Sequence, residues 1–334
     1  MTFPGYETPL VGEHLLRALR DLEVRHVFSI PGAQILPVWD GFHRVVGIDL
    51  VVPHSETSGA FMAEGYGRVA PVPAAVINTL GVGVANEIPA AVSALRSATP
   101  VLFVSPRQPG ASLPGSLPQP RVDKRARRGS VFQGLAHPSL LDLHAKKAFA
   151  PESQLELWCC LPDALAVALA PPAGPVRVHV PYPLLFDRAE PQPAPAPPAR
   201  PPRALAGVLA LEAQGMGESW KKRIFPGAAP EVHWPGIARA GYGMPFALGA
   251  RLARPGVPVV LVTTPEGVLG AVDCVGLARS RGITVHVAEI KTIATPVLKN
   301  AAGLLDATYH LGASDAALQQ LVAGDPDAWL LLCP

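Results

Sequence analysis

The chain lacks the features that mark membrane, secreted and nucleic-acid-binding proteins. Only 6% of its 334 residues are aromatic and 16% are charged, and the net charge is +2. Such a balance gives no general reason to expect nucleic acid or an anionic membrane as a partner. No apolar run approaches the roughly 20 residues that a membrane-spanning helix needs. Residues 1–9 contain no basic region followed by an apolar core, so we expect no export signal and a cytoplasmic protein.

Cysteine is scarce, and the spacing of the four residues excludes the common zinc and redox motifs. Cys159 and Cys160 are adjacent, whereas Cys274 and Cys333 are isolated. We expect all four to be small buried side chains in a reducing compartment. The chain also has no Ser-His-Asp order, HExxH helix or Walker loop, so it carries no signature of the enzymes that those motifs mark.

Proline, in contrast, is abundant, and the 39 prolines are unevenly spread. Residues 187–203 hold a dense run of them, which predicts an extended, semi-rigid linker. A chain of this length suits two domains of about 150 residues each. We therefore predict a first domain over residues 1–186 and a second over residues 204–334.

Short apolar runs alternate with helical patterns on both sides of the linker. The expected strands are 26–30, 49–52, 74–78, 101–104, 176–180, 258–262, 283–288 and 329–332. The expected helices are 10–22, 56–68, 85–96, 161–170, 243–252, 268–281 and 315–322, the last with Ser314 as its N-cap. Strands separated by helices predict α/β domains, each with a parallel sheet covered by helices on both faces.

Two motifs in the first half suggest a family. Glu56 follows a predicted strand and opens a helix rich in small residues, and Gly81, Gly83 and Asn86 form a turn after a later strand. They resemble the pyrimidine-binding domain of thiamine diphosphate (ThDP) enzymes, in particular the acetolactate synthase and 2-oxo acid decarboxylase group. The resemblance implies that Glu56 is the glutamate that activates the cofactor, and that Gly81, Gly83 and Asn86 lie around it.

Simpler interpretations of both motifs remain open. An acidic residue at the start of a helix is stabilised by the helix macrodipole whether or not it has a catalytic role. The glycines of the second motif could serve only the backbone conformation of a tight turn between strand and helix.

The second half resembles the diphosphate-binding domain of the same family. Gly241 and Met244 lie in a glycine-rich segment that opens a helix, where backbone N–H groups could face a diphosphate. Close packing of helix on sheet would explain the same glycines.

The metal-binding signature of the family is altered. Where the family has Gly-Asp-Gly and later Asn-Asn to hold Mg²⁺, this chain has Pro265-Glu266-Gly267 and Lys291-Thr292. Glu266 replaces the aspartate, or Pro265 does if the register is one residue earlier. A protonated lysine repels Mg²⁺, so we expect no Mg²⁺ by the usual motif and name no metal ligand. Lys291 either supplies positive charge to a bound anion or pairs with Glu266.

The resemblance leaves two functions open. The first is a ThDP-dependent decarboxylase or carboligase of a 2-oxo acid, with Glu56 as the cofactor activator and Gly267, Lys291 and Thr292 at the diphosphate. The second is a non-catalytic homologue that has lost Mg²⁺–ThDP binding and acts as a binding or regulatory protein. In both cases the family arrangement implies two ThDP-fold domains and a homodimer.

Overall fold

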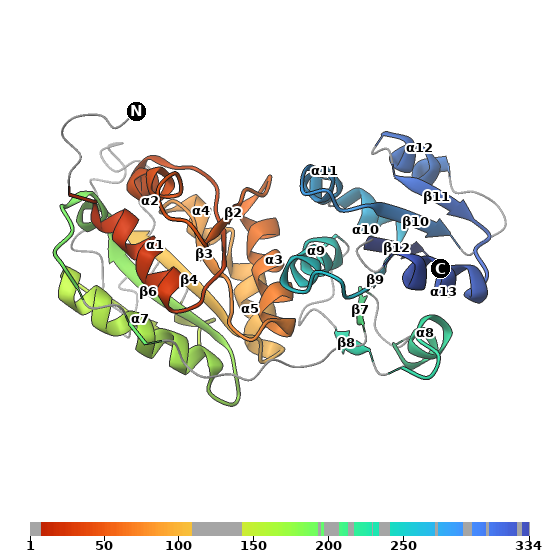
Figure 1. The fold of residues 1–334 in the computed structure, drawn as a ribbon, viewed down its shortest axis with the longest axis horizontal. Coiled ribbons are helices and arrows are strands. Elements are labelled where there is room, and N and C mark those ends of the chain that lie inside the picture. The colour runs from red at the N-terminus through yellow and green to blue at the C-terminus, as the bar shows by residue number, and fades with distance from the viewer. Residues whose placement is uncertain are drawn as a thin grey trace. The chain divides into compact units, whose positions relative to one another are not determined.

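A computed structural model shows two compact units, Met1–Ala60 with Val72–Arg200 and Phe61–Pro71 with Pro201–Pro334 (Figure 1). The structure describes residues 8–108, 142–192, 195–196, 207–212, 217–228, 230–233, 241–270, 273–289, 296–304, 307–325 and 329–333.

The first unit is built on a six-stranded, fully parallel sheet in the order β2-β1-β3-β4-β6-β5. Its strands are β1 His26–Phe28, β2 Asp49–Val51, β3 Ala75–Ile77, β4 Val101–Arg107, β5 Lys147–Phe149 and β6 Pro175–Pro181. Every residue of β3, β4 and β6 is buried, as expected for the central strands of a parallel sheet that is covered on both faces.

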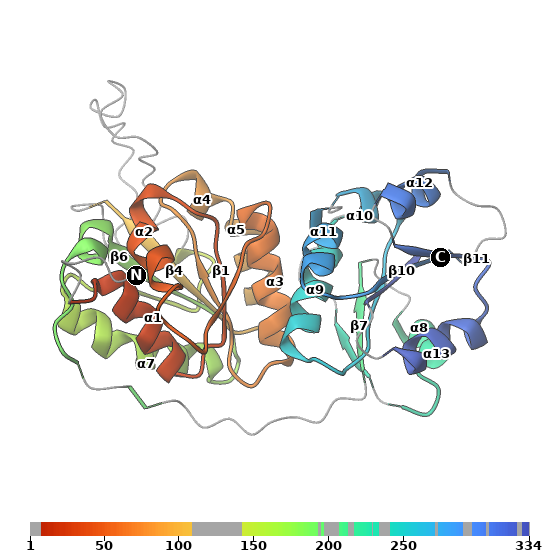
Figure 2. The same ribbon diagram turned by 45° about the horizontal axis from the view of Figure 1, so that its top comes forward.

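Helices connect these strands and cover both faces of the sheet. They are α1 Val11–Asp21, α2 Leu36–Gly41, the start of α3 Glu56–Val69 (whose residues from Phe61 on belong to the second unit), α4 Val82–Ala85, α5 Ile88–Arg96 and α7 Gln154–Leu169, with 3-10 turns at Ala33–Ile35 and Tyr182–Phe186. Figures 1 and 2 show α1 and α7 on one face and α5 on the other. The apolar side of α1 and α7 packs against alternate strand residues such as Val27, Ile77 and Val178, which forms one core.

The second unit has a separate six-stranded parallel sheet in the order β11-β10-β12-β9-β7-β8. Its strands are β7 Val208–Leu211, β8 Glu231–His233, β9 Val259–Val262, β10 Val285–Glu289, β11 Thr308–Leu311 and β12 Trp329–Cys333. Its helices are α8 Gly217–Ile224, α9 Gly243–Ala253, α10 Pro265–Gly270, α11 Asp273–Ser280, α12 Pro296–Leu304 and α13 Asp315–Gly324. Trp220, Ile224 and Leu318 pack on the apolar face of this sheet and form its core.

The predicted fold class, α/β with parallel sheets, is confirmed. The helix expected at 85–96 is divided into α4 and α5, because α5 begins anew at Ile88 with Pro89 in its first turn. Within the helix expected at 268–281 the structure describes α10 and α11, and residues 271–272 lie outside the described residues. Two cysteines differ from expectation: Cys159 is exposed on α7 and Cys160 is only partly buried, whereas Cys274 and Cys333 are buried. In the part of the chain that the structure describes, no helix has both the length and the apolar character to cross a membrane.

Candidate functional site

Glu56 is the first residue of α3, just beyond the carboxyl end of β2. The start of the helix is capped by its neighbour, since the backbone N–H of Ser58 donates a hydrogen bond of 3.1 Å to Oγ of Ser55. The Glu56 carboxylate is therefore not needed as a cap. Its side chain is half-buried, which keeps it accessible to a ligand.

Asn86 holds one side of this carboxylate. Its Nδ2 donates a hydrogen bond of 3.1 Å to Oε2 of Glu56, and its backbone carbonyl accepts one of 2.7 Å from the hydroxyl of Thr57. Among the residues that the structure describes, none donates a hydrogen bond to Oε1 of Glu56. One carboxylate oxygen is thus fixed and the other can receive a donor.

The two glycines of the turn have different roles. Gly81 has a φ of +78°, a conformation that favours glycine, and it precedes the first residue of α4. At Gly83 the backbone is ordinary, but a Cβ there would lie 3.3 Å from Oε1 of Glu56 and 3.2 Å from Cγ2 of Thr79. The lack of a side chain at Gly83 therefore avoids close contacts with Glu56 and Thr79, a reason for glycine in addition to the geometry of the turn.

A buried ion pair lies directly behind Asn86. Glu87 has no solvent exposure and accepts hydrogen bonds of 2.9 Å from Nη1 of Arg177 and 3.0 Å from Nδ2 of Asn78. Burial raises the pKa of Glu87 to about 7, while Arg177 and Asn78 act in the opposite direction and the charge of Glu56 adds slightly to the rise. Burial thus holds the pKa of this carboxyl above its ordinary value, although Arg177 pairs with it.

Arg177 is a charged residue inside the buried strand β6. Its guanidinium stacks 4.5 Å from the ring centre of Phe103, and its Nη1 also lies 3.3 Å from Oγ of Ser105. Nε and Nη2 are buried and have no hydrogen-bond partner among the described residues. Glu87 is thus the only carboxylate that these residues place within ion-pair distance of the Arg177 guanidinium.

In the second unit, the carboxylate of Glu212 is bound to the start of α9. Oε1 of Glu212, just after β7, accepts a 2.8 Å hydrogen bond from the backbone N–H of Gly243, and Oε2 accepts one from the Thr263 hydroxyl. Any Cβ at Gly267 would collide with the Glu212 carboxylate. The chain therefore places a negative charge where the sequence predicted backbone donors for a diphosphate.

The other site residues predicted in this half do not form one cluster among the described residues. Gly241 has a φ of +94° and approaches the backbone of Gly270, and Met244 is fully buried in α9. Glu266 is exposed in the first turn of α10, beside the buried Gly267. Lys291 and Thr292 lie outside the described residues, so the alternatives for Lys291 stay predictions. Within the described ranges, no group of three or more His, Cys, Asp or Glu side chains could hold a metal ion.

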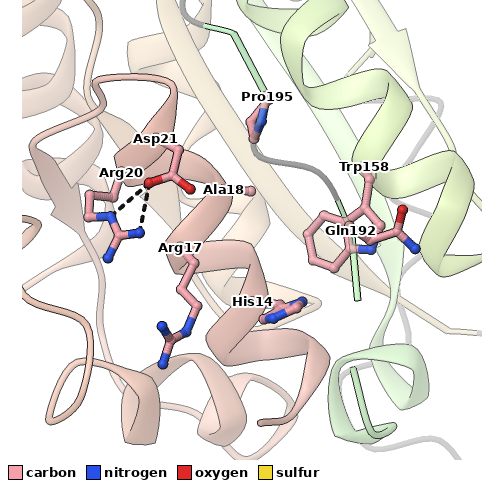
Figure 3. A pocket seen from close by; sticks show the side chains of 8 residues that line it. All are labelled: His14, Arg17, Ala18, Arg20, Asp21, Trp158, Gln192 and Pro195. Atoms are coloured by element: carbon pink, nitrogen blue, oxygen red, sulfur yellow. Dashed lines mark hydrogen bonds and ion pairs between the residues drawn. The ribbon is translucent and has the colours of Figure 1, made fainter. Parts of the chain in front are cut away.

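A pocket of about 250 Å³ lies elsewhere in the first unit, between α1, α7 and the segment after β6 (Figure 3). Its lining includes His14 and Trp158, whose rings meet edge to face at 5.6 Å, and the paired Arg20 and Asp21. None of the predicted site residues lines it, so it is separate from the Glu56 site.

Comparison with known proteins identifies the class. Residues 10–126 match the family model of the thiamine pyrophosphate enzyme N-terminal TPP-binding domain. The fold is similar to a ThDP-dependent 4-hydroxybenzoylformate decarboxylase of Rhodococcus jostii RHA1, with a TM-score of 0.66 and 14% identity over 97% of this chain and 98% of that chain. The chain therefore has the fold of the ThDP-dependent enzymes.

The chain is also similar in sequence to parts of several curated enzymes. The acetolactate synthase large subunit of Haemophilus influenzae is 25% identical over 169 residues, which are 51% of this chain and 27% of that protein. The 2-succinyl-5-enolpyruvyl-6-hydroxy-3-cyclohexene-1-carboxylate synthase of a Synechococcus strain is 32% identical over 60% of this chain and 34% of its own length. These alignments span about a third or less of the curated relatives. The first part of the chain is thus similar in sequence to the TPP-binding N-terminal domain and to acetolactate synthases over about half of this chain.

The two halves fit ThDP unequally. The match to a TPP-binding domain supports ThDP as the cofactor class, and Glu56, held by Asn86, offers one carboxylate oxygen to which an aminopyrimidine ring could donate. In the second unit, Glu212 uses the first amide of α9 and adds negative charge, so the described residues there do not fit a diphosphate.

Sequence reasoning missed Glu87, Arg177 and Glu212. Glu87 and Arg177 carried a visible signal, because each is a charge inside an otherwise apolar segment, and such residues are buried only when they are paired. Glu212 carried none, since a glutamate after an apolar run is most often a solvated residue.

Proposed function

We propose that this chain is a non-catalytic homologue of the ThDP enzymes that keeps the aminopyrimidine-recognition half of the site and acts as a binding or regulatory protein. The observation that supports this proposal is the hydrogen bonding of Glu212 to Gly243 and Thr263. A carboxylate in that place repels a diphosphate and competes with it for the same backbone donor.

The altered metal motif supports the same conclusion. Glu266 is exposed, and Lys291 and Thr292 stand where the resembling family has asparagines. Mg²⁺ demands near-octahedral oxygen ligation at short distance, which a lysine does not provide. Without charge neutralisation, a diphosphate beside Glu212 is unfavourable.

Release of CO₂ from a panel of 2-oxo acids tests the proposal, with the purified full chain supplied with ThDP and Mg²⁺. We expect no release above that of the Glu56→Gln variant, which removes the carboxyl group needed for cofactor activation. Release by the wild-type chain that Glu56→Gln abolishes would contradict the proposal and establish an enzyme.

A second candidate function, a ThDP-dependent decarboxylase or carboligase of a 2-oxo acid, is favoured by the geometry around Glu56. When bound, ThDP supplies the electron sink for such chemistry. In this case the Oε1 side of Glu56 would exchange a proton with the aminopyrimidine ring while Asn86 fixes the other oxygen. The CO₂ assay separates the two candidates.

We also propose that the chain forms a homodimer. Leu36, Val52 and Val82 are each at least 40% exposed, and each follows the carboxyl end of a strand of the first sheet. Since the carboxyl ends of parallel strands lie at one edge, these apolar side chains share the edge that carries Glu56. A second copy of the chain would remove them from water.

A further inference from the structure

We propose that the buried Glu87–Arg177 ion pair is a positioning device that holds Asn86 against Glu56 and thereby determines how well the site accepts an aminopyrimidine. The inference rests on the proposed role of Glu56 as the group that recognises the ring. It assigns a function to Glu87 and Arg177, which neither the family match nor the motif around Glu56 explains.

The first step is the connection between the pair and the site. Asn86 and Glu87 are consecutive residues in the short turn between α4 and α5. Asn86 contacts the first turn of α3 twice, through Glu56 and Thr57, and Glu87 points into the sheet. A displacement of either residue in this turn therefore moves the other.

The second step is that Glu87 does not serve its own helix. It occupies the N-cap position of α5, yet its side chain makes no capping hydrogen bond. The carboxylate is used by Arg177 from β6 and by Asn78, whose Oδ1 accepts a 3.0 Å hydrogen bond from the backbone N–H of Ile30. The turn is thus tied to the ends of β1 and β3 and to the middle of β6.

Burial of the Glu87–Arg177 pair costs free energy. A fully buried ion pair is rarely more stable than apolar side chains of similar volume, because both charges must be removed from water. In this chain two nitrogens of Arg177 are also left without hydrogen bonds to described residues. An arrangement that adds little stability but fixes a turn beside the site is consistent with a role in positioning.

The chain offers a direct experiment because it contains only three asparagines, Asn78, Asn86 and Asn300. Selective ¹⁵N-asparagine labelling of the full chain yields three side-chain amide groups, and Asn300 on α12 serves as an internal reference. In the paired variant Glu87→Leu/Arg177→Met, which removes both charges together, we expect the Asn86 amide to shift and to exchange with water about tenfold faster. The Asn300 signal should not change.

Glu13→Gln is the matched control. Glu13 is also a nearly buried carboxylate held by two arginines, Arg17 and Arg44, but it lies on α1 and makes no hydrogen bond or ion pair with the Glu56 network. We expect this variant to lose stability without changing the Asn86 signal. Glu56→Gln is the positive control, and should change Asn86 but leave Asn78 unaffected.

The outcome is decisive even if the wild-type chain binds no thiamine, because the amide measurement needs no ligand. A folded paired variant whose Asn86 amide keeps its shift and exchange rate would overturn the positioning role. If the wild type does bind thiamine, the paired variant should bind it about tenfold more weakly by calorimetry, with Glu13→Gln unchanged. Equal affinities in the wild type and the folded paired variant would also overturn it. Failure of the wild type to bind would instead count against the proposed function.

Discussion

At the scale of single residues, Glu87 makes stability depend on pH. Because burial raises its pKa from 4.5 to about 7, the folded chain holds a proton between these pH values that the unfolded chain has released. The free energy of unfolding should therefore fall as pH rises through this window. Urea unfolding at pH 5, 6, 7 and 8 measures it. Glu87→Gln should remove this part of the slope, and an identical slope in the variant would contradict the assignment.

The two glycines of the turn should respond differently to alanine. Gly81→Ala places a side chain at a φ of +78° and should cost about 1–2 kcal/mol of stability. Gly83→Ala should cost less stability, because the backbone of Gly83 is ordinary. Its new Cβ would lie 3.3 Å from Oε1 of Glu56 and would push the carboxylate away. Thermal unfolding and thiamine titration of both variants check this. Greater loss of stability at Gly83 than at Gly81 would show that the roles are reversed.

Part of the site could be predicted at this scale, because Glu56 belongs to one recognisable motif, Gly83 and Asn86 belong to another, and the structure brings them together. The contact of Glu87 with Arg177 joins residues 90 positions apart, so its partner depends on the register of β4 and β6 and not on local sequence. Glu212 likewise contacts residues that are distant in sequence, Gly243 and Thr263, so these contacts depend on the fold and not on local sequence.

At the scale of elements, the start of α9 should bind an added anion once the Glu212 carboxylate is removed. Glu212→Gln takes the negative charge from the first amide of α9, and we expect pyrophosphate to bind about three- to tenfold more tightly than to the wild type. Calorimetric titration without Mg²⁺ measures this. Equal affinities for the two proteins would show that Glu212 does not exclude the diphosphate.

Two helices should lose stability when their caps are removed. Ser153 and Ser314 accept hydrogen bonds of 3.2 Å and 3.3 Å from the backbone N–H groups of Glu156 and Ala317. Each serine-to-alanine change should lower the free energy of unfolding by about 1 kcal/mol. Chemical denaturation checks both, with the threonine variants as controls that retain most of the stability.

Three of the four strands that the sequence did not predict share a physical reason. β5, β8 and β11 are edge strands of their sheets and lack a continuous apolar run, as the half-exposed Thr308–Leu311 illustrates. β7 is fully buried, and its apolar run Val208–Leu211 is as long as that of β9, so this strand could have been predicted. Central strands such as β4 and β9 were predictable because they are apolar throughout and bounded by turn residues. The N-cap of α13 at Ser314 was confirmed.

At the scale of the whole molecule, the proposed homodimer predicts a specific response. Val82 is 53% exposed beside the glycine turn, so Val82→Asp places a charge in the proposed interface without disturbing the core. We expect light scattering to give twice the 35.0 kDa mass of the chain for the wild type and a smaller mass for the variant. A wild-type monomer at micromolar concentration would contradict the proposal.

The central claim is that the chain keeps the pyrimidine half of a ThDP site without a working diphosphate half. Comparing the affinities of thiamine and ThDP in the presence of Mg²⁺ tests this most directly, because the two ligands differ only in the diphosphate. We predict that the dissociation constants of thiamine and ThDP lie within about threefold of each other. The Glu56→Gln substitution should raise both about tenfold, and EDTA should change neither. ThDP binding more than about 100-fold tighter than thiamine, and lost on addition of EDTA, would contradict the account.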